Sequence, residues 1–385
     1  MRWWRERTLG EQVYLVAGLL LFSLIVALFV AGVPSSTWDF RNNLWGPTHL
    51  LLNGLSPYRI DQLFEGSNSV WLPTALGAFL PLGSLPLSQA SMLWSIASLA
   101  ALVMCVVAAA RMEKPYPLWL MVALLASFLF PPTVSHFQWG QFTLIALLLS
   151  LCAADMLERG WKLWAVALAL VLSATKPQVV LLLGVGVAVW VLRVHGFLGV
   201  VRLALWGIAW AALLIAPLFL LFPAWIDGLI WAFERNPGWL HPSSLVLLRQ
   251  WLGDTGVIVW GALLAAALIV TVMLWLRIRP TLAVIWTMAL TLLVTPYVWS
   301  YDFVLLLPLM VFTLFQVQRL LTRLLWVAAY SLMWWQFFDL RLNSTNSDEI
   351  FWWVPWAVFV MVGACWLLDA LMRWGRSARP QPKPA

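Results

Sequence analysis

Four short polar segments interrupt a chain that is otherwise strongly apolar, and each carries side chains that can do chemistry. The first follows a long apolar run near the N-terminus. The second reads PPTVSHFQWGQ, the third SATKPQ and the fourth TPYVWSYDF, and prolines break the helical pattern in all three. Their candidate side chains are Asp39, then His136, Gln138 and Gln141, then Lys176, and finally Tyr301 and Asp302.

These residue types suit group transfer at a membrane surface, although each also has a purely structural interpretation. A carboxylate such as Asp39 can act as a general base, but it can also cap a helix or pair with Arg41. His136 and its neighbouring amides can bind hydroxyl groups or satisfy one another. Lys176 can bind a lipid phosphate or extend to the interface.

The composition requires a bilayer as solvent. Of 385 residues, 63% are hydrophobic and 10% are charged, and the mean hydropathy is +0.88, which excludes a soluble globule. The net charge of +7 comes from short Lys and Arg clusters between apolar runs, a pattern of membrane topology and not of nucleic-acid binding. The three cysteines lie in apolar runs and are interpreted as small hydrophobic residues.

The apolar runs predict an all-α, polytopic transmembrane bundle of about twelve spans. One membrane domain, 1–373, is expected, with external loops at 34–87 and 223–254 and a disordered tail at 374–385. The broken run Val70 to Pro86 is predicted to be re-entrant or interfacial. The expected spans are 13–33, 88–110, 116–133, 141–157, 161–174, 178–192, 203–222, 255–276, 281–296, 302–317, 324–339 and 351–372.

This layout places most basic residues on one side of the membrane. All but six of the 23 Lys and Arg residues fall on the side of the N-terminus, so both termini are predicted to be cytoplasmic. The longest connections and most acidic residues fall on the other side, where a functional site is expected. The six exceptions are Arg41, Arg59, Lys176, Arg235, Arg249 and Arg341.

The order of the motifs resembles glycosyltransferase family 87, polyprenyl-phosphate-dependent, mannosyltransferase-like membrane enzymes of the GT-C class. The resemblance covers roughly residues 10 to 320, and the chain carries Tyr301 and Asp302 where some relatives have a histidine in the last motif. The matching motifs are Asp39, Gly54-Leu55-Ser56-Pro57-Tyr58, Trp71 with Pro73, Pro81 and Pro86, Trp139-Gly140-Gln141, Lys176-Pro177-Gln178 and Thr295 to Asp302.

The resemblance implies a GT-C-like fold and transfer of a sugar, mannose by analogy, from a polyprenyl phosphate to a lipid or glycan acceptor. It also implies that Asp39 is the catalytic base. The expected setting is the outer face of a bacterial plasma membrane, with membrane lipids as further partners and no nucleic acid. A single displacement would invert the anomeric centre, and we expect neither a metal nor a cofactor.

Charge and hydroxyl chemistry assign the remaining candidates. The departing phosphate needs cations, for which we expect Lys176, supported by Arg41, Arg59, Arg235 and Arg249. The aromatic faces of Trp139 and Trp299 are expected to stack on sugar. Candidates for sugar and acceptor hydroxyls are Tyr58, His136, Gln138, Gln141, Tyr301 and Asp302.

Three alternatives stay open at the level of sequence. A polytopic flippase or small-molecule transporter would use similar breaks, although polar residues cluster on one face and no internal repeat is visible. A non-catalytic scaffold would need none of these side chains individually. A related transferase could move an aminosugar, a pentose or glucose.

Overall fold

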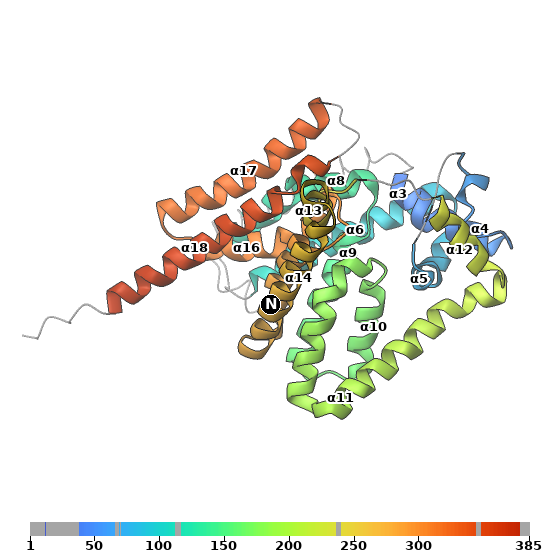
Figure 1. Ribbon diagram of the computed structural model, residues 1–385, viewed down its shortest axis with the longest axis horizontal. Helices are drawn as coiled ribbons and strands as arrows, with labels where there is room; N and C mark the ends of the chain where they lie inside the picture. The colour runs from blue at the N-terminus through green and yellow to red at the C-terminus, as the bar shows by residue number, and fades with distance from the viewer. Residues whose placement is uncertain are drawn as a thin grey trace, which may run out of the picture.

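The computed structural model describes Gln12 and residues 38–65, 69, 71–111, 117–235, 240–343 and 348–377. Within these residues the chain is helical, with no strand, so the predicted all-α fold class is confirmed (Figure 1). The first predicted span, 13–33, lies outside the described residues. The predicted tail overlaps the end of the last helix, which runs to Ser377.

Proline opens several of the helices, since its missing N–H is not needed in the first turn. Examples are Pro73, Pro131, Pro177 and Pro280. The first helices are α3 (Trp38–Phe40), the π-helical turn η1 (Arg41–Trp45), α4 (Gly46–Leu52), η2 (Ile60–Gln62), α5 (Pro73–Gly83), α6 (Leu87–Ala110), α7 (Pro117–Phe128), α8 (Pro131–Trp139), α9 (Thr143–Glu158), α10 (Leu163–Ser173) and α11 (Pro177–Leu221).

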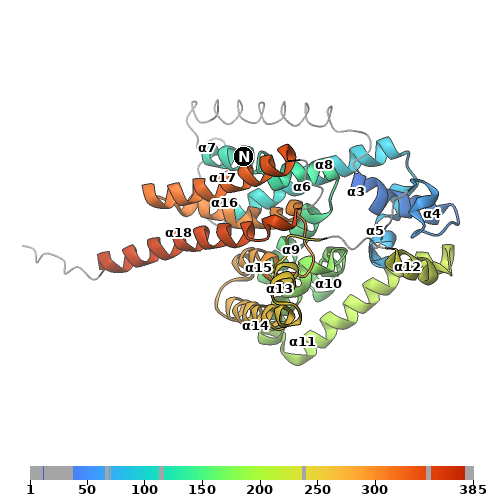
Figure 2. The ribbon, with the colours of Figure 1, turned by 45° about the horizontal axis from the view of Figure 1, so that its top comes forward.

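The second half of the chain ends in two long helices, α17 with 23 residues and α18 with 24. Figures 1 and 2 show α17 and α18 running side by side, and the two are in extensive contact. The elements are α12 (Trp225–Glu234), α13 (Ser244–Leu252), α14 (Asp254–Arg277), α15 (Pro280–Val294), η3 (Ser300–Leu306), α16 (Leu307–Gln316), α17 (Leu320–Leu342), η4 (Glu349–Phe351) and α18 (Val354–Ser377).

Fewer helices are long and apolar enough to cross a membrane than the twelve predicted. Among the described residues four qualify: α6, α11, α14 and the stretch Glu349–Leu371. The pair α7 and α8, bent by 54°, makes a fifth if counted as one span. Other predicted spans are shorter helices, such as α10 with 11 residues and α15 with 15. The chain is therefore an integral membrane protein, and the number twelve is not confirmed.

The helix α11 joins two predicted spans, 178–192 and 203–222, across a bend. Gly196 interrupts the helix with φ 68° and ψ −173°, a conformation that glycine adopts most readily. The second half of α11 then leads away to α5 and α12 (Figure 1). A Cβ added to Gly77 of α5 would overlap the carbonyl of Leu214, so these helices pack backbone against backbone.

The core lies between α6, α9, α15, α16 and η3, and it is built from small, branched and aromatic apolar side chains. Trp275 of α14 is fully buried on Gly186 of α11, where any larger residue would overlap its ring. Its indole N–H donates to the hydroxyl of Thr287 at 3.0 Å. The bundle is thus a packed scaffold that holds the ends of α8, α9, α11 and α15 together.

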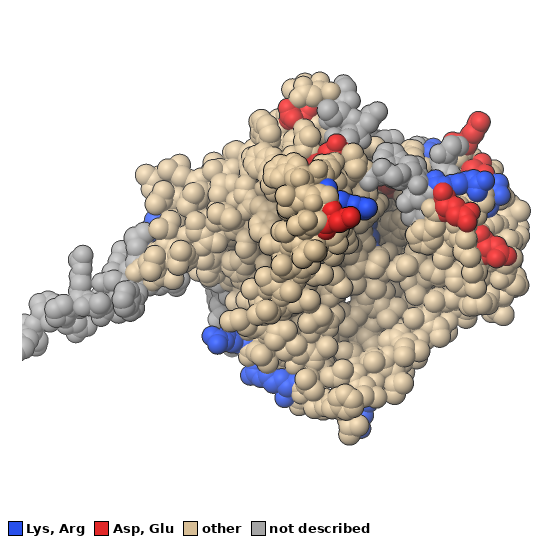
Figure 3. All heavy atoms as spheres, in the orientation of Figure 1, with Lys and Arg blue, Asp and Glu red and all other residues tan. Residues whose placement is uncertain are grey.

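Charged side chains are separated on the face drawn in Figure 3. Lys and Arg appear at its lower edge, where α11 bends and α14 ends, without Asp or Glu beside them. Acidic side chains appear at the upper edge and, together with basic ones, over α4 and α12. The two edges therefore differ in the sign of their charge.

Candidate active site

Asp39 is held in α3 by two amide side chains. It is 9% exposed, Gln141 donates to its Oδ2, and Asn43 donates to its Oδ1 at 3.1 Å. The expected alternative, a pair with Arg41, is not formed: that guanidinium donates to Asn42 at 2.9 Å and lies 4.1 Å from the Phe64 ring. Asp39 therefore has neutral amide partners and no arginine partner among the described residues.

Gln141 reaches Asp39 because of how α8 ends. Gly140 adopts the left-handed conformation, φ 67° and ψ 42°, directly after the helix. The N–H of Gln141 donates to the carbonyl of His136 at 3.0 Å and that of Gly140 to Phe137 at 3.3 Å, which is a Schellman motif. Trp94 fixes the turn from α6 by donating to the Gly140 carbonyl at 2.9 Å. The W-G-Q motif is thus a rigid helix stop that directs an amide into the site.

A buried ion pair forms the second half of the site. Lys176 Nζ lies 2.7 Å from Asp302 Oδ1 and 2.9 Å from Thr143 Oγ1, and both charged side chains are almost fully buried. Thr143 also donates to Asp302, and the N–H of Trp299 donates to its Oδ2 at 3.2 Å. Lys176 stands directly before Pro177, the first residue of α11. The K-P motif therefore places a cation at a helix start.

The two halves act on each other electrostatically. Burial raises the pKa of Asp39 to about 7, the charge of Lys176 and the Gln141 hydrogen bond oppose the rise, and the charge of Asp302 adds to it. We call Asp39, Gln141, Thr143, Lys176 and Asp302 the central polar group. A carboxylate with a pKa near neutrality is well matched to proton transfer at ordinary pH.

An aromatic row borders the central polar group. The Lys176 ammonium lies 4.9 Å from the Tyr301 ring centre, and the Tyr301 ring stacks on Trp299 at 6.2 Å. Trp299 Nε1 donates to the Tyr297 hydroxyl at 3.1 Å. His241 closes the row, with its ring centre 4.0 Å from Tyr297 and 4.7 Å from Trp299.

The sequence interpretation missed His241. The loop 223–254 was expected to be functional because of its length, and His241 is the one histidine in it, so the signal was present. His136, which was predicted, is fully buried on α8, and neither ring nitrogen has a hydrogen-bond partner among the described residues. Lys176 is close enough to act on it electrostatically.

Several predicted residues lie elsewhere. Tyr58 is fully buried in a separate apolar cluster with Leu76, Leu218 and Trp225. Gln138 is exposed and accepts a hydrogen bond from Arg341. The structure therefore does not bring these two side chains to the central polar group.

The predicted arginines also have other partners among the described residues. Arg59 pairs with Asp61 at 3.0 Å, and both Arg59 and Arg235 lie over the Trp231 ring, at 4.1 and 4.6 Å. We call Tyr58, Arg59, Asp61, Trp231 and Arg235 the α12 cluster. Arg249, on α13, is exposed. Among the predicted phosphate-binding cations, Lys176 belongs to the central polar group, where it contacts Asp302.

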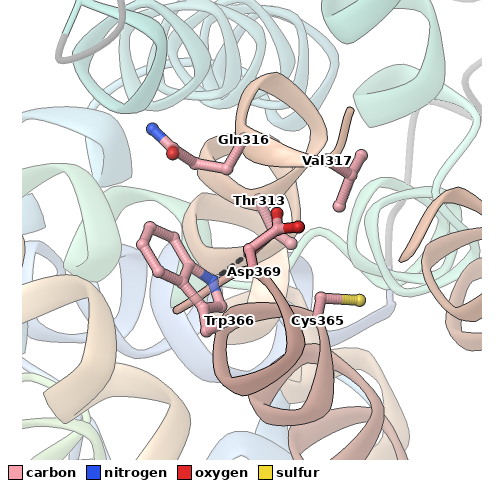
Figure 4. A pocket seen from close by; sticks show the side chains of 6 residues that line it. All are labelled: Thr313, Gln316, Val317, Cys365, Trp366 and Asp369. Carbon is pink, nitrogen blue, oxygen red and sulfur yellow. Dashed lines mark hydrogen bonds between the residues drawn. The ribbon is translucent and has the colours of Figure 1, made fainter. Parts of the chain in front are cut away.

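A small pocket lies apart from these residues, between the end of α16 and the middle of α18. Figure 4 shows Trp366 donating to the hydroxyl of Thr313, at 3.1 Å, with Asp369 and Cys365 beside them. A second cavity, of about 360 Å³, lies between α7, α16 and α17 and is lined by Trp119, Arg323 and Trp326 among others. Neither is lined by a residue of the central polar group.

Comparison with known proteins identifies the family. No curated protein matches the chain. The sequence model of glycosyltransferase family 87 matches residues 72–296, more than half of the chain, including Gln141 and Lys176. Asp39 and Asp302 lie outside that range and reach the site through the fold. The chain therefore belongs to glycosyltransferase family 87 and is a membrane glycosyltransferase.

Proposed function

We propose that this glycosyltransferase moves a sugar, mannose first among the candidates, from a polyprenyl phosphate to a lipid or glycan acceptor at the outer face of a bacterial plasma membrane. The observation that carries the proposal is Asp39, a buried carboxylate held by Gln141 and Asn43 beside the Lys176–Asp302 pair. It combines a base with a cation within one small polar region of a membrane protein.

In the proposed reaction, the acceptor hydroxyl oxygen bonds to the anomeric carbon. Its proton passes to a carboxylate oxygen of Asp39. The bond between the anomeric carbon and the phosphate oxygen breaks, and its electrons leave with the polyprenyl phosphate. One displacement of this kind inverts the anomeric centre. A positioned base typically contributes about 10²- to 10⁴-fold to such a step.

Lys176 is proposed to stabilise the charge that gathers on the leaving phosphate. A cation in a buried setting stabilises developing negative charge more strongly than one in water. Asp302 and Thr143 hold the ammonium in place before the donor arrives. The ion pair therefore sets the position of Lys176, and the phosphate becomes an additional anionic partner during the reaction.

The partnerless polar groups beside this cluster support a sugar ligand. His136, the Gln141 Oε1 atom and the Thr175 hydroxyl are buried without a hydrogen-bond partner among the described residues. Such groups are costly unless something binds them, about 1–3 kcal/mol each. Hydroxyl groups of a sugar can both donate to and accept from them.

The test is a transfer assay in lipid nanodiscs. Labelled polyprenyl-phosphate mannose, then its glucose and arabinose counterparts, are offered with a lipid and glycan extract, with and without chelator. We expect transfer that persists in chelator, falls at least about 10²-fold in Asp39→Asn and inverts the anomeric centre. Asp155→Asn, an exposed carboxylate paired with Arg159, is the matched control.

Each part of the proposal has its own contrary result. Full activity in Asp39→Asn assigns the base elsewhere, and retained configuration refutes the single displacement. Transfer from nucleotide sugars alone refutes the polyprenyl-phosphate donor. Flipping of a labelled polyprenyl-phosphate sugar across liposomes, unchanged in Asp39→Asn and without transfer, supports the flippase alternative.

A further inference from the structure

His241 is a buried imidazole whose polarity the fold does not use. His241 is 7% exposed, and its Nδ1 atom has no hydrogen-bond partner among the described residues. A buried polar atom without a partner costs about 1–3 kcal/mol. A phenylalanine of similar shape would pack there without this cost, so the imidazole needs another explanation.

Neighbouring residues, and not the imidazole, fix the position of this segment. The Ser243 hydroxyl donates to the carbonyl of Pro296 at 3.1 Å, and that of Ser244 donates to Leu293 at 2.8 Å. Trp356 of α18 donates in turn to the Ser244 oxygen at 2.9 Å. The loop before α13 is thus attached to the end of α15, which presents the imidazole at a defined place beside the site.

The aromatic row connects this place to the central polar group. His241 contacts Tyr297 and Trp299, Trp299 stacks on Tyr301, and Tyr301 lies under the Lys176 ammonium. Tyr297 is 39% exposed, so the row leads from the surface to the buried ion pair. Aromatic faces with a few polar edges are typical of small-molecule sites, and a sugar ring presents an apolar face and several hydroxyl groups to such a wall.

The imidazole is neutral in this setting. Burial lowers the pKa of His241 to about 4, against a smaller opposing effect of the Asp302 charge. A neutral imidazole has one N–H donor and one acceptor nitrogen. Such a ring can bind a sugar hydroxyl in either direction without adding charge near Lys176.

We infer that His241 is a specificity-determining residue that hydrogen-bonds a hydroxyl group of a sugar ring lying along Tyr297, Trp299 and Tyr301. The inference rests on the proposed function in that a sugar enters this site. The ring belongs either to the donor or to the acceptor, and the two sources are separated by measuring the KM of each substrate.

The test compares His241→Phe and His241→Asn with the wild type in nanodiscs, using the sugar donor that the wild type accepts. The phenylalanine keeps the ring but removes both nitrogens, and the asparagine restores a polar group near Nδ1. We expect His241→Phe to raise the KM of one substrate about tenfold, which corresponds to about 1.4 kcal/mol, with kcat changed less than about twofold. Asparagine should recover part of the loss.

Protein stability and a matched histidine provide the controls. His195, exposed on α11, is changed to Gln and should alter neither KM. Thermal unfolding of His241→Phe should be unchanged or raised, because a partnerless polar atom is removed. Unchanged KM values for both substrates overturn the inference, as does a loss of activity that follows a loss of stability. The test can use any sugar donor that the wild type accepts, so it remains valid if the donor is not a polyprenyl phosphate. A wild type that accepts no sugar donor overturns both the proposed function and this inference.

Discussion

The central polar group and the α12 cluster contain similar side chains but differ in how the chain builds them. Both place cations and carboxylates together, with aromatic rings beside or among them. The central polar group draws on α3, the start of α9, the start of α11 and η3, and its charges are buried. The α12 cluster joins residues 58–61 to one helix, and its ion pair, Arg59–Asp61, is 40% and 31% exposed.

This difference in burial changes the desolvation cost of the charges and therefore how strongly they indicate a functional site. An exposed pair such as Arg59–Asp61 contributes little, typically about 0–1 kcal/mol, because water screens it. A buried pair such as Lys176–Asp302 carries a desolvation cost that close geometry must offset. A chain that keeps three ionisable groups, Asp39, Lys176 and Asp302, buried together is more readily explained by a function there.

The largest expected effect comes from breaking the buried pair on one side. Lys176→Met leaves Asp302 as a buried carboxylate without its cation, a change that typically costs about 3–5 kcal/mol. Thermal unfolding in nanodiscs should show a large loss of stability, and the double variant Lys176→Met/Asp302→Asn should recover most of it. A single variant as stable as the wild type would contradict the pair's structural importance and weaken the comparison of the two regions.

The next effect is on the pH dependence of activity. In the proposed reaction Asp39 must be ionised to accept a proton, so the proposal predicts that kcat/KM rises with pH through about 7. The same raised pKa has the opposite effect on the free energy of unfolding. The folded state binds the proton on Asp39 more tightly than the unfolded state does. The contribution of Asp39 to stability therefore falls as pH rises from about 4 to about 7.

Variants of Lys176 and Asp302 should shift the pH dependence of kcat/KM in opposite directions. Lys176 lowers the pKa of Asp39 and Asp302 raises it. The midpoint should therefore shift to higher pH in Lys176→Met and to lower pH in Asp302→Asn, in rate profiles of whatever activity remains. Midpoints that do not move, or that move together, would show that the two charges do not act on the group that titrates.

Sequence patterns predicted the assembly of the central polar group better than the helices around it. Asp39, Gln141, Lys176 and Asp302 come from four separate breaks that were expected on one face, and the structure brings them together. Polar groups next to proline breaks in an apolar chain are costly unless they meet. Their individual roles remain predictions.

The number of spans was less predictable, for a physical reason. Hydropathy measures how apolar a segment is, and a short helix buried in the bundle, such as α10 or α15, is as apolar as one that crosses the bilayer. Tyr58 became a candidate through the G-x-x-P-Y motif, but a motif does not specify which way its ring points, and the ring packs towards α12. His241 could be recognised as part of the site only from the position of the loop before α13, and no local sequence pattern specifies that position.

A smaller effect is expected from the turn that directs Gln141. Gly140 adopts a positive φ, and an alanine there costs about 1–2 kcal/mol. Gly140→Ala should lower the unfolding temperature slightly and reduce kcat/KM by more than Gly160→Ala, which changes another glycine with positive φ at the end of α9. Equal effects of the two variants would show that the W-G-Q turn serves only to end α8.

The smallest effects should come from the α12 cluster, and they provide the sharpest test of the comparison. Arg59→Gln and Arg235→Gln each remove an exposed cation over Trp231. If this cluster only attaches α12 to residues 58–61, stability should change by less than about 1 kcal/mol, and the donor KM should change by less than about threefold. If instead the donor KM rises tenfold or more in both variants and depends less on salt concentration than the wild-type KM does, these arginines bind the donor phosphate. The α12 cluster would then be an outer part of the donor site, and burial alone would no longer separate the functional region from the structural one.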